Sequence, residues 1–244
     1  MKYKEFDREL WQTLKTALRN RNIKNKIAAF DADGTLWGKD AGEAFFEHQI
    51  NHCQLELPEE PLKHYLDLKL KNPTEAYLFL ARINKGKTLD QVRGFAEDCL
   101  KNEKNWPYFL SQKILISYLK DLGFEVFVVT ASVKWAVEPF AKMMGIDEKH
   151  VLGVTTKVKN NIITDEQDGF ITYREGKALK LLESTSGEFP FLSSGNSFGD
   201  LILLESATDL RLCIHSEKEN ESLKKEELKL KEVAKKKNWL THEF

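Results

Sequence analysis

Cysteines and long apolar runs are scarce in this sequence. Its 244 residues include three scattered cysteines, Cys53, Cys99 and Cys213, so neither a disulfide framework nor a cysteine zinc site is predicted. No apolar stretch is long enough to cross a bilayer. The first residues, MKYKEFDREL, are too charged for a signal peptide. We therefore expect a cytoplasmic protein with no membrane partner.

An excess of basic charge is also missing. The chain has 37 Lys and Arg against 38 Asp and Glu, a formal net charge of -1. A general nucleic-acid-binding protein usually carries a strong basic excess, so no nucleic-acid partner is expected. Hydrophobic residues make up 41% of the chain, which excludes a disordered protein.

The pattern of apolar residues predicts an α/β fold. Short apolar runs typical of buried strands occur at 27–30, 124–129, 190–192 and 210–214, and helical stripes lie between them. Repeated strand, helix and strand units indicate a mostly parallel sheet with helices on both faces, a three-layer α/β/α core. Residues 40–105 have a helical pattern without a strand signal, which indicates a helical insert.

Polar residues follow the predicted strands, where ligands bind in such folds. Asp31 and Asp33 come after the first strand, and Gly34 allows a sharp turn behind them. Two neighbouring carboxylates repel each other unless a cation, a set of donors or a shifted pKa relieves the repulsion. Such a pair can divide nucleophilic attack and proton transfer between its members. The alternative is an Asx turn that ends the strand.

Three further groups lie at strand ends or helix starts. Thr130 to Ser132 suit an anion cradle or an ordinary helix cap. Lys177 is a cation near the start of a predicted helix, where most lysines are exposed. Asn196 and Asp200 offer oxygens that suit a hard cation such as Mg²⁺, or they cap a loop. Each group alone is weak evidence for a functional site, but their order along the chain favours one shared pocket.

These residues resemble the motifs of the haloacid dehalogenase superfamily of phosphatases. The segment FDADGTL at 30–36 resembles the first motif and VTAS at 129–132 the second. Lys177 resembles the third, and GNSFGD at 195–200 the fourth. The helical insert is similar to the small cap of the phosphoserine phosphatase branch. The resemblance implies a Rossmann-like core at 1–39 and 106–244, with a cap at 40–105.

The resemblance also implies a magnesium-dependent phosphomonoesterase. Asp31 would attack phosphorus and form an aspartyl-phosphate, and Asp33 would act as general acid and base. Thr130 would hold phosphoryl oxygens, and Lys177 would offset charge. The implied magnesium ligands are Asp31, Asp33, Asn196 and Asp200. Many relatives have Asp where this chain has Asn196, so the metal site is expected to lose one negative charge. Asp33 favours ester hydrolysis over dehalogenation, because a halide leaving group needs no proton.

The cap is expected to select the substrate. Asp40 lies where phosphoserine phosphatases place a Glu that meets the substrate ammonium, and Glu43 lies one turn further along. Arg82 resembles a cap Arg that meets the substrate carboxylate, although a surface position is the alternative. Trp37 could offer its aromatic face to an ammonium group, or it could pack beneath the cap, which we favour. The expected substrate-binding residues are Gly34, Asp40, Glu43, Arg82, Ala131 and Ser132.

The expected substrate is therefore a small phosphorylated metabolite that carries an amine. Phosphoserine is the first candidate substrate, and phosphocholine or phosphoethanolamine is the next. A phosphotransferase is an alternative activity. A non-catalytic phosphate-binding protein is the alternative from another class, with Asn196 as its support.

Overall fold

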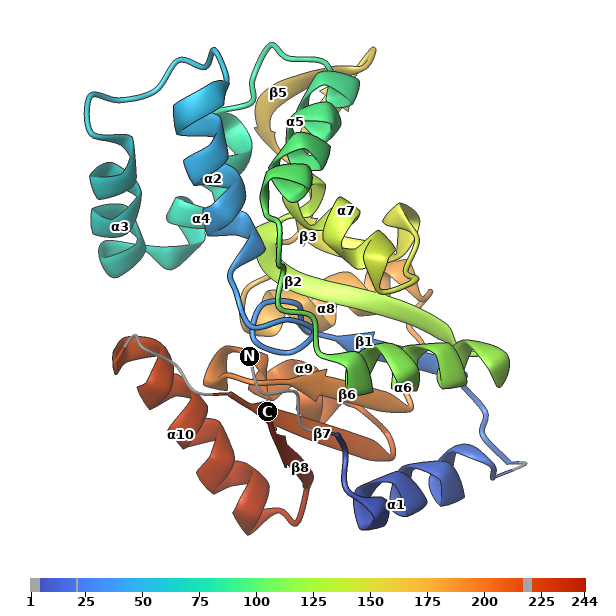
Figure 1. Cartoon of the computed structure of the whole chain (residues 1–244). Helices are drawn as coiled ribbons and strands as arrows, with labels where there is room; N and C mark the ends of the chain where they lie inside the picture. The colour runs from blue at the N-terminus through green and yellow to red at the C-terminus, as the bar shows by residue number, and fades with distance from the viewer. Residues whose placement is uncertain (1–4, 21, 217–220) are drawn as a thin grey trace.

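The computed structural model describes residues 5–20, 22–216 and 221–244, without the side chains of 221–223. Its main sheet has the strand order β3-β2-β1-β6-β7-β8 (Figure 1), and every pairing in it is parallel. The strands are β1 (Ile27–Phe30), β2 (Glu125–Val133), β3 (Val151–Val154), β6 (Leu192–Gly195), β7 (Leu210–His215) and β8 (Leu240–Glu243). The predicted α/β class and the mostly parallel sheet are confirmed.

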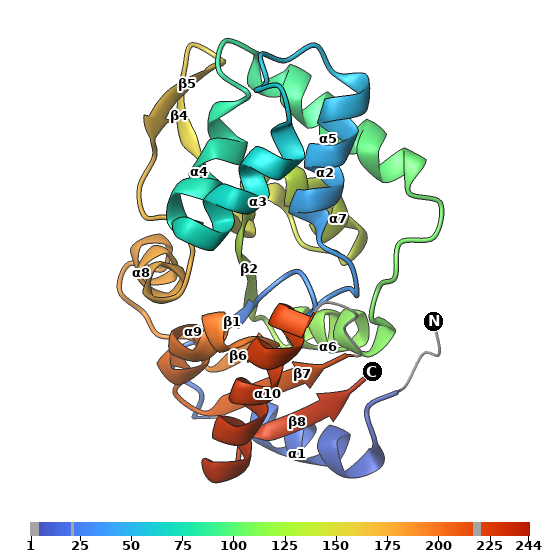
Figure 2. The same cartoon turned by 90° about the vertical axis from the view of Figure 1, so that its left-hand side faces the viewer.

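Helices cover both faces of this sheet (Figures 1 and 2). They are α1 (Arg8–Leu18) and α6 (Leu110–Asp121) on one face, and α8 (Glu175–Ser184), α9 (Leu201–Ser206) and α10 (Glu221–Lys236) on the other. Successive strand residues point to opposite faces. Thus Ala28 and Phe30 share a core with α1 and α6, while Ile27 and Ala29 share one with α8 and α9. Burial on both faces explains why β1 is a continuous apolar run.

A helical cap lies over the carboxyl edge of the sheet, as Figure 1 shows at the top of the view. Its helices are α2 (Ala41–His52), α3 (Pro61–Lys71), α4 (Pro73–Arg82) and α5 (Leu89–Asn102). The side chains of Asp40, Asn72 and Thr88 each accept a backbone N–H three residues on. These N-caps satisfy donors that a helix start leaves free, so the starts of α2, α4 and α5 follow from local sequence.

A hairpin from the second half of the chain joins the cap. It consists of β4 (Thr156–Lys159) and β5 (Ile162–Gln167). The turn residues Asn160 and Asn161 have φ values of 50° and 64°, the positive values that the favoured two-residue hairpin turn requires. Backbone bonds of 2.9 Å join Gly86 N to Ile163 O and Ile163 N to Lys87 O. The cap predicted at 40–105 therefore has a second contributor.

Three details differ from the sequence prediction. Strand β6 begins at Leu192 and runs through Ser193 and Ser194, because small polar residues can be buried between two strands. Strand β2 continues past Thr130 to Val133. Strand β8 reads LTHE, without an apolar run, and it forms by pairing with β7. Within the described residues, no helix combines the length and apolarity that a membrane crossing requires.

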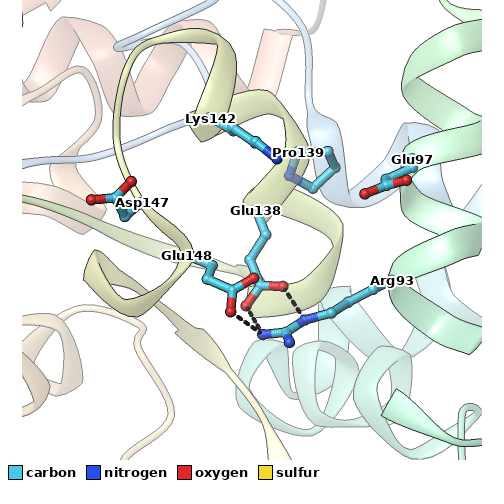
Figure 3. A pocket seen from close by; sticks show the side chains of 7 residues that line it. All are labelled: Arg93, Glu97, Glu138, Pro139, Lys142, Asp147 and Glu148. Atoms are coloured by element: carbon cyan, nitrogen blue, oxygen red, sulfur yellow. Dashed lines mark hydrogen bonds and ion pairs between the residues drawn. The ribbon is translucent and has the colours of Figure 1, made fainter. Parts of the chain in front are cut away.

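Helix α7 (Lys134–Met143) connects the core to the cap. The Arg93 guanidinium on α5 donates to Glu138 of α7 at 2.8 and 3.1 Å and lies 3.4 Å from Glu148 (Figure 3). The cavity beside these ion pairs, of about 230 Å³, is lined by Arg93, Glu97, Glu138, Pro139, Lys142, Asp147 and Glu148. Because Glu138 is buried and paired, we interpret this cluster as a structural joint between cap and core.

Candidate active site

A cavity of about 200 Å³ lies at the carboxyl edge of the sheet, beneath the cap. The strands β2, β1 and β6 are neighbours in the sheet, so the residues that follow them meet at this place. The lining residues are Asp31, Asp33, Gly34, Gly38, Lys39, Asp40, Tyr77, Thr130, Ala131, Ser132, Tyr173, Lys177, Asn196, Ser197, Gly199 and Asp200. All four sequence motifs therefore share one cavity.

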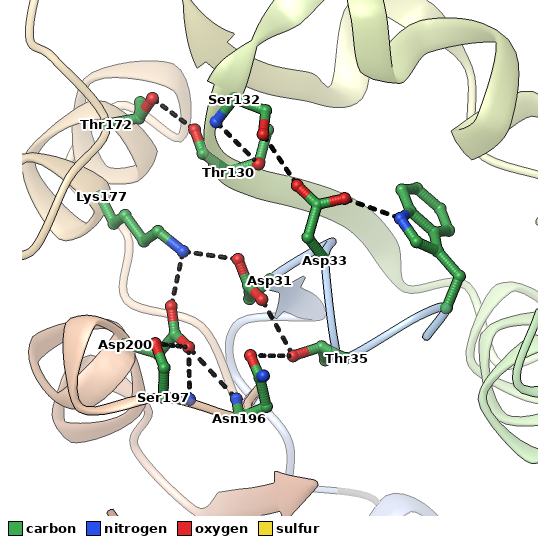
Figure 4. A network of polar contacts seen from close by, with 11 residues as sticks. Asp31, Asp33, Thr35, Thr130, Ser132, Thr172, Lys177, Asn196, Ser197 and Asp200 are labelled. Atoms are coloured by element: carbon green, nitrogen blue, oxygen red, sulfur yellow. Dashed lines mark hydrogen bonds and ion pairs between the residues drawn. The ribbon is translucent and has the colours of Figure 1, made fainter. Parts of the chain in front are cut away.

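The Lys177 ammonium lies between two buried carboxylates (Figure 4). Its Nζ donates to Asp31 Oδ1 at 2.6 Å and to Asp200 Oδ1 at 2.5 Å. Lys177 is 3% exposed, Asp31 6% and Asp200 1%. Lys177 is therefore not the exposed surface lysine that is usual at such a position. A buried charge is tolerated when it is paired and hydrogen-bonded, and this lysine connects helix α8 to β1 and the fourth motif.

Burial and charge act in opposite directions on these groups. Burial and the neighbouring Asp200 raise the pKa of Asp31 to about 6, against the lowering effect of Lys177 and Thr35. Burial alone would lower the pKa of Lys177, but Asp200 and Asp31 outweigh it and raise that pKa. Lys177 is therefore a fixed cation at neutral pH, and it keeps the Asp31 carboxylate ionised there.

Asp33 is held by a separate set of donors. Its Oδ1 accepts the Trp37 indole N–H at 2.7 Å and the Ala41 backbone N–H at 2.8 Å, and its Oδ2 accepts the Ser132 hydroxyl at 2.7 Å. Burial raises the pKa of Asp33, and the donors from Ala41, Ser132 and Trp37 oppose that rise. Trp37 is fully buried, and its ring centroid lies 6.0 Å from those of Tyr108 and Phe140, outside the cap helices. Its indole N–H also orients Asp33, a role that the sequence did not predict.

The loop after β1 turns back sharply behind the two carboxylates. Gly34 has a φ of 90°, a region that L side chains rarely adopt. The Thr35 hydroxyl that follows lies 3.0 Å from Asp31 Oδ2 and 3.2 Å from Asn196 Oδ1. The hydroxyl has one proton, which it can donate to one acceptor at a time. The Asp31 oxygen after β1 and the Asn196 oxygen after β6 therefore lie close to the same hydroxyl group.

In the fourth motif, both carboxylate oxygens of Asp200 accept hydrogen bonds from neighbouring residues. Its Oδ2 accepts the backbone N–H groups of Asn196 and Ser197 at 3.1 and 2.9 Å and the Ser197 hydroxyl at 3.0 Å. Its Oδ1 accepts Lys177. These contacts shape the loop and anchor Lys177. The assignment of Asp200 as a metal ligand stays a prediction.

The second motif also differs from expectation. Thr130 to Ser132 belong to strand β2, and α7 begins only at Lys134. They therefore do not form a cradle at a helix start. The Ser132 backbone N–H donates to Thr130 Oγ1 at 3.1 Å, and the Thr130 carbonyl accepts the Thr172 hydroxyl. The strand register shifts between Val129 and Val133, an irregularity of the kind that re-aims side chains near active sites.

The predicted substrate-binding residues of the cap divide into two groups. Asp40 lines the cavity, where burial raises its pKa to about 8, with help from Asp33 and Glu43 and against Lys69. Glu43 does not line the cavity, and its carboxylate pairs with Lys69 at 2.7 Å. Arg82 is also absent from the cavity lining. Its guanidinium donates to Glu75 and to the carbonyl of Asp165, so the structure does not bring it to the site.

Two tyrosines that the sequence analysis overlooked form part of the cavity wall. Tyr77 from α4 and Tyr173 from the loop before α8 lie with ring centroids 5.4 Å apart. Their ring contact links the cap to the core at the cavity that Lys177 also lines. Isolated tyrosines without a motif give no sequence signal, so this pair could not have been found before the fold was known.

No group of three or more His, Cys, Asp and Glu side chains in the described parts of the chain is arranged to hold a metal ion. Two oxygens that could bind a metal ion lie close to the Thr35 hydroxyl: a carboxylate oxygen of Asp31 and the amide oxygen of Asn196. Magnesium prefers oxygen ligands and is commonly bound through one or two carboxylates, with water completing the shell. The donor chemistry therefore fits magnesium with few protein ligands.

The chain matches the sequence model of haloacid dehalogenase-like hydrolases over residues 28–204. That match includes all four motifs and well over half of the chain. The protein therefore belongs to the haloacid dehalogenase-like hydrolase family, and the superfamily prediction is confirmed. No curated protein sequence is similar enough to match.

Solved structures share the fold at low sequence identity. A Bordetella pertussis Tohama I protein of unknown function has a TM-score of 0.70 at 17% identity, covering 90% of this chain and 98% of its own. A conserved Anaerococcus prevotii DSM 20548 protein of unknown function has a TM-score of 0.74 at 16% identity, covering 98% and 92%. A substrate-bound phosphoserine phosphatase has a TM-score of 0.51 at 18% sequence identity, covering 88% of this chain and 99% of its own. The likeness is one of fold.

The Lys177→Met variant tests the charge balance of the site. It leaves Asp31 and Asp200 buried without their cation, so the free energy of unfolding at pH 7 should fall by roughly 3–5 kcal/mol. Urea denaturation measures this loss, which should shrink at acid pH as the carboxylates take up protons.

The matched control is Lys180→Met on the same helix, which removes a surface ion pair with Glu183. An exposed pair contributes about 0–1 kcal/mol. Equal stability of the two variants would contradict a central role for Lys177.

Proposed function

We propose that this protein is a magnesium-dependent phosphomonoesterase that hydrolyses a small, amine-bearing phosphorylated metabolite. The observation that carries the proposal is a buried carboxylate, Asp31, fixed between the Lys177 ammonium and the Thr35 hydroxyl, with Asp33 beside it in the same cavity. Two carboxylates in different environments suit two different roles in catalysis. Family membership in a hydrolase class supports the same conclusion.

In the proposed reaction Asp31 is the nucleophile. One of its oxygens attacks phosphorus in line with the leaving oxygen, and an aspartyl-phosphate forms as the ester bond breaks. The Asp31 carboxylate approaches the negatively charged phosphate in a buried cavity, so positive charge must offset their repulsion. Lys177 is held for that task by Asp31 and Asp200. Thr130, which lines the cavity, would donate its hydroxyl to a phosphoryl oxygen.

Asp33 is the proposed general acid and base. Burial raises its pKa, which favours a protonated carboxyl that can donate to the leaving alcohol. The resulting carboxylate then takes a proton from the water that hydrolyses the aspartyl-phosphate. The donors from Trp37, Ala41 and Ser132 fix its orientation throughout.

Magnesium is the proposed cofactor. Asp31, Asn196 and the backbone carbonyl of Asp33 would hold it, and it would supply positive charge that shields the nucleophile from the phosphate. Asp200, which lines the same cavity, is the remaining proposed ligand and would add negative charge beside the ion.

The proposed substrate follows from the cap side of the cavity. Asp40 places a half-buried carboxyl group there, beside the tyrosine pair Tyr77 and Tyr173. Burial raises the pKa of Asp40 to about 8, and a bound ammonium would lower that pKa and favour the ionised carboxylate. The carboxylate and the aromatic faces together then favour an organic ammonium group. A cavity of about 200 Å³ suits a metabolite rather than a phosphoprotein. We propose phosphoserine, phosphoethanolamine and phosphocholine as the esters to test, with no nucleic acid or membrane as partner.

Replacing the nucleophile should abolish turnover without unfolding the protein. We expect Asp31→Asn to lower phosphate release from p-nitrophenyl phosphate by at least about 10³-fold, while its melting temperature stays near that of the wild type. Wild-type activity should vanish with EDTA and return with added Mg²⁺. A variant that retains wild-type turnover would refute the assigned mechanism.

Removing one donor of Asp33 should shift the pH profile in a known direction. The Ser132 hydroxyl lowers the Asp33 pKa, so Ser132→Ala should raise it. Because the acid must be protonated for the first chemical step, the alkaline limb of kcat/KM should move to higher pH. Ser197→Ala, which affects Asp200 instead, is the control and should leave this limb in place. A shift to lower pH in Ser132→Ala would contradict the role of Asp33.

The Asp40→Asn variant tests the amine preference. Asn remains a good helix N-cap, so α2 should stay intact while the charge is lost. We expect KM for the amine-bearing ester that is turned over to rise about tenfold, which is 1.4 kcal/mol. Turnover of p-nitrophenyl phosphate, which has no amine, should be unchanged. An equal effect on both esters would mean that Asp40 supports the fold of the site and does not recognise an ammonium.

A further inference from the structure

A carboxylate from the C-terminal helix contacts the one neutral side chain of the proposed metal site. Asn196 Nδ2 donates to Glu227 Oε1 at 3.0 Å. The two residues are 31 positions apart, and they are 5% and 7% exposed. Helix α10 packs against the turn that contains Phe198, and the Lys229 ammonium lies 5.9 Å from the Phe198 ring centroid. The helix is thus seated against the fourth motif.

This contact decides which way the Asn196 amide points. An amide has a donor end and an acceptor end. A carboxylate is an acceptor, so Glu227 accepts the amide N–H and repels the amide oxygen. The oxygen therefore faces the opposite side, where it meets Thr35 at 3.2 Å and shares that hydroxyl with Asp31. With the amide reversed, an oxygen would face Glu227, and the metal side would present N–H groups, which cannot bind a cation.

The position of Glu227 on its helix is unusual for a charged residue. Leu230 and Ala234 of α10 are fully buried with Leu204 and Cys213. Glu227 lies three residues before Leu230, on the same helical face. A carboxylate on a buried face costs free energy unless it is well hydrogen-bonded. The hydrogen bond from Asn196 is one contact that offsets this cost.

The same carboxylate restores the charge that the fourth motif lacks. Asn196 replaces the Asp that many members of the family have at this position, so the site has one negative charge fewer. Glu227 adds a negative charge one hydrogen bond behind it. We infer that Glu227 is a positioning residue of the magnesium site, which orients the Asn196 oxygen toward the ion and supplies the missing charge. The inference rests on the proposed function.

Magnesium titration of the whole chain, without any substrate, tests the inference. Loss of a partner behind a metal ligand typically costs about 10–100-fold in affinity. We expect Glu227→Ala to weaken Mg²⁺ binding, measured by isothermal titration calorimetry, by that factor. The stabilising shift in melting temperature on adding Mg²⁺ should shrink in parallel. Glu232→Ala removes an exposed carboxylate from the same helix and should bind Mg²⁺ as the wild type does.

A paired substitution keeps the test decisive if Glu227→Ala does not fold. The double variant Asn196→Asp with Glu227→Gln moves the charge onto the ligand and keeps a donor behind it. We expect it to bind Mg²⁺ far more tightly than Glu227→Gln alone. Wild-type affinity in a folded Glu227→Ala protein would overturn the inference, as would a folded double variant as weak as Glu227→Gln. A wild-type chain that binds no Mg²⁺ would instead contradict the proposed function.

Discussion

The two ion pairs of Lys177 are the constraint on which the site depends. Asp31 follows β1 and Asp200 ends the short turn of helix after β6, and both carboxylates are buried. Without a cation between them, their mutual repulsion and their loss of solvent would work against folding. The lysine therefore stabilises an arrangement in which Asp31 lines the cavity. Stability and the proposed chemistry use the same three side chains.

The parallel sheet brings these residues together. Because β1 lies between β2 and β6, the residues at the ends of all three strands reach one edge, although the chain separates Asp33 from Ser132 by 99 positions and Thr35 from Asn196 by 161. The cap closes this edge from above, and the hairpin of β4 and β5 is bonded to it. Helix α10 adds Glu227 from the far end of the chain. The site is thus assembled from nearly the full length of the protein.

The sequence was informative where chemistry and local pattern coincide. The order of Asp31, Thr130, Lys177 and Asp200 at strand ends predicted one pocket, and the alternation of elements predicted the sheet. It was not informative where a role depends on tertiary contact. Trp37 and Glu227 carry no motif, and their contacts arise only when distant segments pack together. Arg82 fitted a motif but pairs elsewhere, because β5 offers it the Asp165 carbonyl.

The central claim is that Asp31 takes the phosphoryl group from the substrate. Turnover of an amine-bearing phosphomonoester, quenched in acid and followed by peptide mapping with mass spectrometry, tests it most directly. The account predicts a phosphoryl group on the Asp31 side chain, and none on Asp33 or Asp200. Steady release of phosphate with no phosphorylated Asp31 at any quench time, or with the group on another residue, would contradict it.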